Sequence, residues 1–352
     1  MAFDSKREDL VVLINSYFEI YQIGEREFIG KVREPLEINL KNLKMALESY
    51  GYFPFFFKKK KIHMLTLIPK IAKEKKKENY WINLLLFILT LFTTLLVGSF
   101  HQGGNPFSKI TDIFLGIPFS FSLLAILGFH ELGHYFFAKK ENVSVSLPYF
   151  LPVPHPLIGT MGAFIKMRSI IPSKRALIKV GVAGPLTGFL MALPITYFGL
   201  RLSKVIKLEE IKYGLSLGNS IIFSLLSKFV FKNIPNGYDI LLHPMAFAGW
   251  LGFFVTALNL IPLGQLDGGH IAYALFGRLK IFILSILAIL LFLSRYWLGW
   301  AFWVLIVSLL GLRHPPVQDE ITPLRKRDIF LAILALIILI LSFPPVPFSM
   351  GR

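Results

Sequence analysis

The chain has 352 residues, of which 54% are hydrophobic and only 17% are charged. Soluble globular chains are about one quarter charged, so this composition excludes a soluble enzyme and a disordered chain and indicates a polytopic membrane protein. Cysteine is absent, which excludes disulfides and leaves histidine, aspartate and glutamate as metal ligands. The net charge of +17 is typical of contact with cytoplasmic lipid headgroups, and no nucleic-acid-binding pattern accompanies it.

The first eighty residues are charged, and none of their apolar runs is long enough to cross a bilayer. Their periodicity predicts a small soluble α+β domain of order ββαββ, followed by a basic connector. The expected elements are strands at 18–23, 26–32, 52–57 and 62–68 and a helix at 36–50. The first residues have no apolar core of a signal peptide, so we expect the first membrane span to direct insertion.

The remainder is dominated by long apolar runs, which predict an α-helical membrane protein with about six to seven transmembrane helices. The expected spans lie near 82–99, 113–137, 177–199, 244–262, 279–294, 297–312 and 329–343. Lysines before the first span predict a cytoplasmic amino terminus. The basic residues within 201–243 contradict this orientation, so the placement of that segment stays open. We therefore divide the chain into a soluble domain with its connector (1–80), a membrane core (81–312), and a basic loop with a last helix (313–352).

The second span contains the sequence His130-Glu131-Leu132-Gly133-His134. Histidines four residues apart lie on one face of a helix, at the spacing that a single zinc ion requires, and Glu131 lies where its carboxylate can reach a bound water. A glutamate in the middle of a span costs about 2.5–3.5 kcal/mol to insert, which a function usually justifies. The alternative interpretation is a pair of buried histidines that bond to neighbouring helices.

A third ligand is expected after the fourth span, in the sequence NLIPLGQLDGG. Asp267 is the only carboxylate between Asp239 and Asp319, and Gly268 and Gly269 permit a sharp turn that directs it toward the helices. The second and fourth spans are predicted to run in the same direction, which puts His134 and Asp267 at the same membrane depth. Alone, Asp267 could equally be a turn residue at a helix end.

The combination of HELGH in a span with NLIPLGQLDGG at a membrane boundary resembles the site-2 protease family of intramembrane zinc metalloproteases. The resemblance covers residues 81–312 and favours the branch with a soluble amino-terminal extension, which includes plant chloroplast members. It implies one Zn²⁺ held by His130, His134 and Asp267, with Glu131 as the catalytic carboxylate. It also implies that Asn259 holds the substrate backbone.

The resemblance further implies a membrane-associated β-hairpin within residues 148–169, around Gly159 and Gly162, whose edge would bind an unwound substrate. The segment 182–189 matches a family span in which small residues allow close helix contact. We interpret His155 as a loop residue, His270 as a residue that supports the site or faces solvent, and His243 as structural.

The resemblance implies hydrolysis of peptide bonds in membrane-anchored proteins or peptides, in a membrane that we expect to be a prokaryotic cell membrane, with the site near its cytoplasmic side. One alternative is a membrane zinc transporter, although Asp267 is the only plausible partner of the histidine pair. A second is a membrane zinc protease class with a distal glutamate ligand, which lacks the LDGG turn. A third is an inactive scaffold, against which the intact Glu131 argues. The physiological substrate, the role of residues 1–80 and the oligomeric state do not follow from the sequence.

Overall fold

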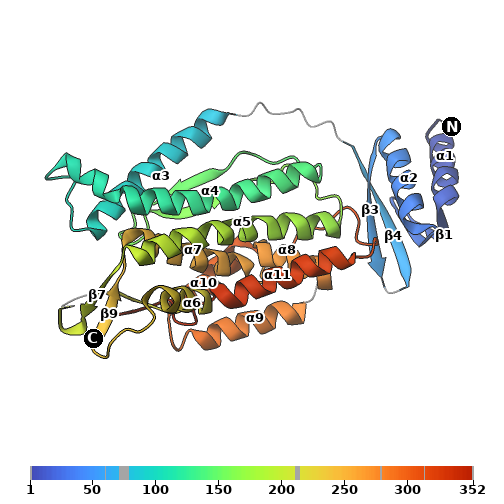
Figure 1. Ribbon diagram of the computed structural model, residues 1–352. Coiled ribbons are helices and arrows are strands. Elements are labelled where there is room, and N and C mark those ends of the chain that lie inside the picture. The colour runs from blue at the N-terminus through green and yellow to red at the C-terminus, as the bar shows by residue number, and fades with distance from the viewer. Residues whose placement is uncertain are drawn as a thin grey trace. The chain divides into compact units, whose positions relative to one another are not determined.

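The computed structural model of the chain describes residues 2–59, 61–70, 79–210, 215–277, 280–312 and 314–350 (Figure 1). Most of the predicted basic connector, residues 71–78, lies outside these ranges. The chain forms two compact units. The smaller unit combines residues 1–77 with the segments 170–177 and 315–326, and the larger unit contains the rest.

The smaller unit is an antiparallel sheet of strand order β1-β2-β4-β3 with two helices. Its elements are α1 (Ala2–Tyr17), β1 (Phe18–Ile23), β2 (Glu27–Val32), α2 (Leu36–Ser49), β3 (Tyr52–Lys59) and β4 (Ile62–Pro69). This order contains the four strands and the helix expected from the sequence, preceded by α1, which the sequence pattern did not predict. Helix α1 contributes Leu10 and Ile14 to the hydrophobic core of the unit.

Periodicity explains how this sheet and α2 share a core. Leu40, Leu43 and Leu47 are buried at the three- and four-residue spacing of one helix face. Alternate residues of β4, among them Leu65 and Leu67, are buried in the same core, as the two-residue period of a strand requires.

A segment from near the end of the chain extends this sheet beyond β3. The backbone N–H of Phe56 donates to the carbonyl of Gln318 (2.8 Å), and the N–H of Glu320 donates to the carbonyl of Phe56 (2.9 Å). Ile321 is buried in the core of the unit. On the segment 170–177, the guanidinium of Arg175 forms an ion pair with Glu37 of α2 at 2.7 Å.

Helices dominate the larger unit (Figure 1). They are α3 (Tyr80–His101), α4 (Ile117–Lys140), α5 (Lys174–Arg201, whose first residues belong to the smaller unit), α6 (Ile221–Phe231), α7 (Pro244–Leu260), α8 (Asp267–Phe276), α9 (Lys280–Leu293), α10 (Gly299–Leu310) and α11 (Lys326–Ser342), with short 3₁₀ helices at Ile110–Gly116 and Leu208–Glu210.

Three two-stranded antiparallel sheets complete the larger unit. They are formed by β5 (Tyr149–Pro152) with β6 (Thr160–Phe164), by β7 (Lys204–Lys207) with β9 (Tyr238–Leu241), and by β8 (Leu215–Leu217) with β10 (Phe348–Met350). The first pair is a hairpin within the segment where one was expected. The second pair and α6 lie in the segment 201–243, whose placement the sequence left open.

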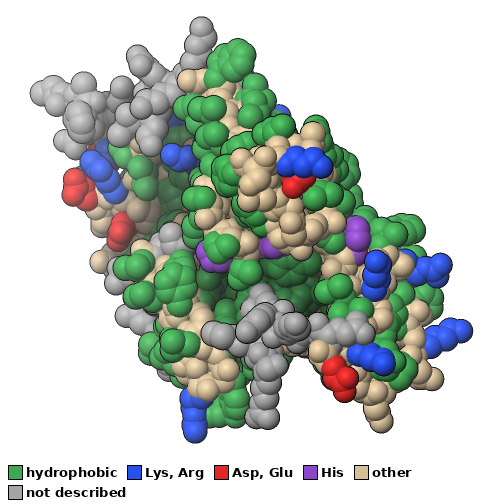
Figure 2. All heavy atoms as spheres, turned by 90° about the vertical axis from the view of Figure 1, so that its left-hand side faces the viewer, with side chains coloured by type: hydrophobic (Ala, Val, Ile, Leu, Met, Phe, Trp, Pro, Cys, Tyr) green, Lys and Arg blue, Asp and Glu red, His purple; other side chains and the backbone are tan. Residues whose placement is uncertain are grey.

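Within the residues that the structure describes, three helical stretches are long and apolar enough to cross a membrane, namely Tyr80–His101, Ile110–Lys140 and Lys174–Arg201. Shorter apolar helices lie at Ile221–Phe231, Pro244–Leu260, Ile283–Leu293 and Gly299–Leu309. Many large apolar side chains are exposed on these elements, and hydrophobic side chains cover much of the face drawn in Figure 2. The protein is therefore an integral membrane protein, while a total of six to seven spans stays a prediction.

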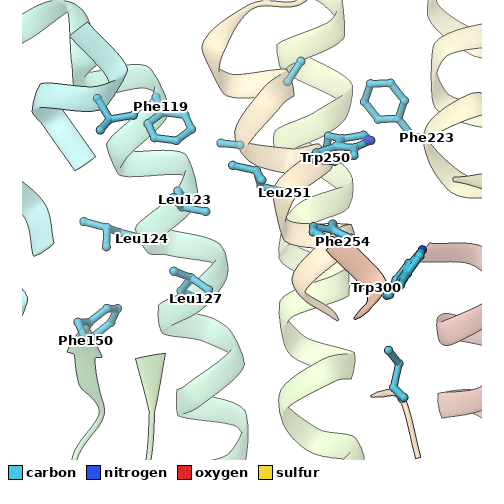
Figure 3. Close-up of a cluster of buried hydrophobic side chains, with 14 of the residues drawn as sticks. Phe119, Leu123, Leu124, Leu127, Phe150, Phe223, Trp250, Leu251, Phe254 and Trp300 are labelled. Carbon is cyan, nitrogen blue, oxygen red and sulfur yellow. The ribbon is translucent and has the colours of Figure 1, made fainter. Parts of the chain in front are cut away.

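One hydrophobic core contains leucine side chains of α4 and aromatic side chains of α7 and α10 (Figure 3). Trp250 and Trp300 are fully buried, and the ring of Phe254 lies between them at 5.6 and 6.5 Å between centroids. Each indole N–H finds a carbonyl, that of Gly218 at 2.7 Å for Trp250 and that of Pro345 at 2.8 Å for Trp300. Because both polar groups are satisfied, the two tryptophans stabilise the packing of α7 and α10.

Candidate metal centre

Helix α4 carries the predicted motif on its buried side. His130, Glu131 and His134 are only 4%, 5% and 6% exposed. The two imidazole rings face each other with centroids 4.9 Å apart, because residues four apart on a helix project from the same face.

The carboxylate of Asp267 meets these two rings from α8. Its Oδ2 lies 3.2 Å from Nε2 of His130 and 3.2 Å from Nε2 of His134, and the two Nε2 atoms are 3.1 Å apart. Two zinc bonds of about 2.0 Å at the tetrahedral angle separate their ligand atoms by about 3.3 Å. The three atoms therefore have the mutual spacing of three ligands of one tetrahedral ion.

The protonation of His134 fits this use. Its Nδ1 is 2.8 Å from the carbonyl oxygen of Val180 on α5, so that nitrogen carries the proton and donates, and Nε2 keeps its lone pair for a metal. A carboxylate oxygen and an imidazole lone pair at 3.2 Å repel each other unless a cation or a proton lies between them. Among the described residues, this is the only cluster of histidine and acidic side chains with the spacing of a metal site.

Asp267 is the first residue of α8, and two glycines after it allow the helix to turn back against α7. A Cβ atom at Gly268 would lie 2.0 Å from the carbonyl oxygen of Leu260, and one at Gly269 would lie 2.4 Å from that of Gly264. No side chain fits at either position. The glycines of the LDGG sequence thus let the backbone approach closely enough to bring Asp267 to the histidines.

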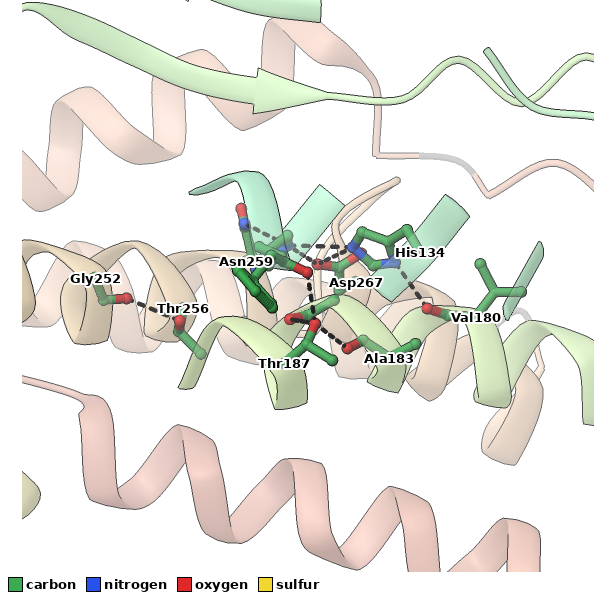
Figure 4. Close-up of polar contacts among 11 residues, drawn as sticks. His134, Val180, Ala183, Thr187, Gly252, Thr256, Asn259 and Asp267 are labelled. Carbon is green, nitrogen blue, oxygen red and sulfur yellow. Dashed lines mark hydrogen bonds and ion pairs between the residues drawn. The ribbon is translucent and has the colours of Figure 1, made fainter. Parts of the chain in front are cut away.

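Helix α5 packs directly on the two histidines through small residues. A Cβ atom at Gly184 would lie 2.1 Å from Nε2 of His134, and one at Gly188 would lie 3.1 Å from Cβ of His130. The hydroxyl of Thr187, one turn from Gly184, lies 2.8 Å from the carbonyl oxygen of Phe129 on α4 and 2.8 Å from that of Ala183 on its own helix. Figure 4 shows Thr187 and Ala183. Helix α5 therefore holds α4 at the turn that carries the motif.

The sequence predicted close helix contact by the small residues of the segment 182–189, and Gly184 makes such a contact with His134. The contacts of the Val180 carbonyl and the Thr187 hydroxyl with α4 were missed, because their partners depend on how the two helices pack.

Two further groups lie next to the cluster. The side-chain amide nitrogen of Asn259 on α7 is 3.4 Å from Nε2 of His130 (Figure 4). The carboxylate of Glu131 accepts a hydrogen bond from the backbone N–H of Ile165, the residue after β6. Glu131 is not part of the cluster of His130, His134 and Asp267, and its role stays a prediction.

The close neighbours of the two hairpin glycines do not include the side chains of the cluster. Gly159 has a φ of +75° and packs against α3, where its carbonyl accepts the hydroxyl of Thr93 at 2.7 Å. Gly162 has a φ of +95°, and a Cβ atom there would meet no atom within 4 Å. Their role in binding substrate stays a prediction.

The other histidines also have definite surroundings. Nδ1 of His155 accepts the N–H of Leu157 within the hairpin loop at 3.3 Å. Nδ1 of His243 accepts the N–H of Met245 at the start of α7 at 3.3 Å. His270 is buried and contacts His314, so of its two expected settings the solvent-facing one does not apply.

A comparison with known protein families matches residues 118–294 to peptidase family M50, a stretch that covers half of the chain and includes α4, α5, α7 and α8. The chain belongs to peptidase family M50. The stretch that matches the M50 family contains His130, Glu131, His134 and Asp267.

Relatives of this M50 chain are found among plant proteins. It is 32% identical over 66% of its length to the probable zinc metalloprotease EGY2, chloroplastic, of Arabidopsis thaliana, and covers 42% of that protein. The chain is 31% identical over 58% of its length to the probable zinc metalloprotease EGY1, chloroplastic, of Oryza sativa subsp. japonica, and covers 39% of that protein. It is 30% identical over 90% of its length to the EGY3 protein of Oryza sativa subsp. indica, covering 59% of it. The M50 chain thus spans about two to three fifths of these relatives. No solved structure matches it.

Proposed function

We propose that the protein is a zinc-dependent intramembrane endopeptidase that hydrolyses peptide bonds in or near the membrane segments of anchored proteins or peptides. One observation carries the proposal: Nε2 of His130, Nε2 of His134 and Oδ2 of Asp267 lie 3.1–3.2 Å from one another in apolar helices, with Glu131 beside them. The family match and the zinc metalloproteases among the relatives support the metal and the reaction.

In this proposal His130, His134 and Asp267 hold one zinc ion and leave its fourth position open, as catalytic zinc sites do. A bound zinc ion supplies a Lewis acid, which lowers the pKa of water and polarises a carbonyl. A carboxylate oxygen of Glu131 accepts a proton from the attacking water and passes it to the amide nitrogen as the C–N bond breaks. The N–H of Ile165 orients that carboxylate through its hydrogen bond.

The β5–β6 hairpin is the proposed place for the substrate backbone. A helical substrate hides its carbonyls in hydrogen bonds, and in an apolar setting an unwound segment needs new partners for them. A strand edge supplies such partners. Asn83 of α3 donates to the carbonyls of Leu147 and Pro148, at 3.1 and 2.9 Å, on the β5 side of the hairpin. This supports β6, whose following residue Ile165 contacts Glu131, as the strand nearer the substrate.

The proposed orientation puts the amino terminus and the active site toward the cytoplasm. Lys139 and Lys140 lie in the last turn of α4, about one turn beyond His134, and basic residues favour the cytoplasmic side. A prokaryotic cell membrane remains our prediction for the location, and the relatives named above are chloroplastic.

The proposal is tested with purified protein in lipid and a substrate that has a single membrane span. Glu131→Gln should abolish cleavage and keep the zinc content, because the ligand atoms are unchanged. The His130→Ala and Asp267→Ala proteins should lose both cleavage and bound zinc. The control is Ser308→Ala, since the hydroxyl of Ser308 donates to the carbonyl of Val304 on its own helix. Cleavage by the Glu131→Gln protein at the rate of the control would refute the mechanism, and zinc transport by that protein would favour the transporter.

A further inference from the structure

The helix that supplies Asp267 is short and begins without a side-chain cap. Helix α8 comprises Asp267–Phe276, and Leu266 before it makes no side-chain hydrogen bond that would cap the helix. The close contacts of Gly268 and Gly269 fix how near α8 lies to the end of α7. They do not by themselves fix its rotation about its own axis, because a glycine has no side chain to interlock with its neighbours.

A segment after α10 contacts α8 and the turn before it. Nε2 of His314 lies 2.5 Å from Nδ1 of His270, which is one helical turn beyond Asp267. The His314 ring also stacks on Tyr273, with centroids 4.3 Å apart and planes inclined by 17°. In addition, a Cβ atom at Gly264 would lie 2.6 Å from the carbonyl oxygen of Gly311. The backbone of the segment that carries His314 therefore packs closely against the turn before Asp267.

The residues that make these contacts, Gly311 and His314, belong to one stretch of chain. They contact one residue before Asp267, Gly264, and two residues after it, His270 and Tyr273. His270 and Tyr273 are 8% and 5% exposed, so their contacts with His314 are shielded from water. A hydrogen bond between two imidazoles needs one donor and one acceptor in line, and the stack restricts the plane of the His314 ring. These contacts restrict the rotation of α8. Helix α5 packs on it as well, since a Cβ atom at Gly181 would lie 3.3 Å from the carbonyl oxygen of Asp267 and 3.3 Å from Cβ of His270.

We propose that His314 is a positioning residue for the metal ligand Asp267, which it holds in register with His130 and His134 through His270 and Tyr273. This inference rests on the proposed function. The distances between zinc and its ligand atoms vary by only about 0.2 Å. A side-chain carboxylate lies well outside the roughly 2.3 Å radius of the helix backbone, so a small rotation of the helix moves it by a comparable distance. A rotation of α8 by a few degrees therefore moves the Asp267 carboxylate away from a zinc-binding distance. His314 acts on the metal site through the position of α8.

The test compares two substitutions at the same position. His314→Phe keeps an aromatic ring against Tyr273 and removes the bond to His270, whereas His314→Gln restores a group that can bond to His270. The matched control is His101→Phe, because His101 packs edge-on against Phe119 at 5.1 Å between ring centroids and has no contact with α8 among those described. All three are made in the full-length protein in the Glu131→Gln background, so that no measurement depends on cleavage.

Zinc affinity is measured by competition with a chelator, and hydrogen exchange of the α8 amides is measured after zinc removal. His314→Phe should weaken zinc binding about 10- to 100-fold, the usual effect of losing a partner that orients a ligand. It should also speed exchange in α8, while His314→Gln and His101→Phe stay near the parent protein. The proposal is overturned if His314→Phe binds zinc as tightly as the parent, or if His314→Gln and His314→Phe weaken binding equally. Neither result bears on whether Glu131 performs hydrolysis.

Discussion

Replacing Gly184 with alanine places one methyl group against a metal ligand. The added Cβ would lie 2.1 Å from Nε2 of His134 and 2.4 and 2.5 Å from two ring carbons. The ring cannot move aside freely, because Val180 holds its Nδ1 at 2.8 Å and Asp267 faces its Nε2. Either His134 leaves its position or α5 moves away from α4, and both changes disturb the centre.

Inserting a methyl group into a filled interior costs about 1–3 kcal/mol. If the strain falls on the ligand geometry, it corresponds to a loss of zinc affinity of about 5- to 150-fold. We therefore expect Gly184→Ala to bind zinc more weakly by this factor. Cleavage should fall in parallel and recover in part when zinc is added in excess.

The matched control is Gly128→Ala in α4. A Cβ atom there would meet only Phe150, at 4.0 Å, and alanine is favoured over glycine in a helix by about 0.5–1 kcal/mol. Gly128→Ala should therefore keep its zinc affinity and be as stable as the parent or more so. Chelator competition and a thermal unfolding curve are recorded for both variants. If Gly184→Ala binds zinc as tightly as Gly128→Ala, the packing of α5 does not constrain His134 and the reasoning fails.

Two further predictions concern a helix contact and a buried histidine. Thr187→Val keeps the shape of the side chain and removes the hydroxyl that is shared between the carbonyls of Phe129 and Ala183. We expect a loss of about 1 kcal/mol in stability, measured by thermal unfolding, and an unchanged midpoint would contradict the role of this hydroxyl. Burial and two nearby lysines lower the pKa of His63 below its usual 6.5, and its Nδ1 accepts the N–H of Val32. In the folded smaller unit His63 therefore stays neutral to lower pH than it does in the unfolded chain. As the pH falls below 6.5, His63 takes up a proton in the unfolded chain before it does so in the folded unit, and this lowers the stability of the folded unit. Hydrogen exchange in β2 and β4 between about pH 5 and pH 7 should show this fall, and His63→Gln should remove that part of it; an equal fall in both proteins would refute the assignment.

The sequence was most informative where one side chain performs one chemical task. Histidines four apart on a helix can only share a face, so His130 and His134 could be paired from their spacing alone. Asp267 could be named because carboxylates are rare in apolar segments. Its approach to within 3.2 Å of both histidines depends on how a turn and two glycines fold, and spacing along the chain does not give that distance.

Other features could not be predicted, for physical reasons. The Val180 carbonyl is a group that nearly every residue has, and only the packing of α5 makes this one an acceptor for His134. The pairing of His314 with His270 joins segments whose neighbourhood depends on the whole helix arrangement. Helix α1 has a weak amphipathic pattern, and it is buried only through residues such as Leu10 and Ile14 that meet a sheet formed later in the chain. Long-range contacts of this kind are properties of the fold rather than of a local pattern.

The strand-like segment around Asp319 has a consequence for the order in which the chain becomes folded. It pairs with Phe56 of β3, although helices α3 to α10 lie between the two segments in the sequence. During synthesis, β3 therefore stays an open sheet edge until the last helix but one has been made, and open edges invite wrong pairing. The smaller unit is therefore completed only after α3 to α10 have been synthesised, so its sheet closes late.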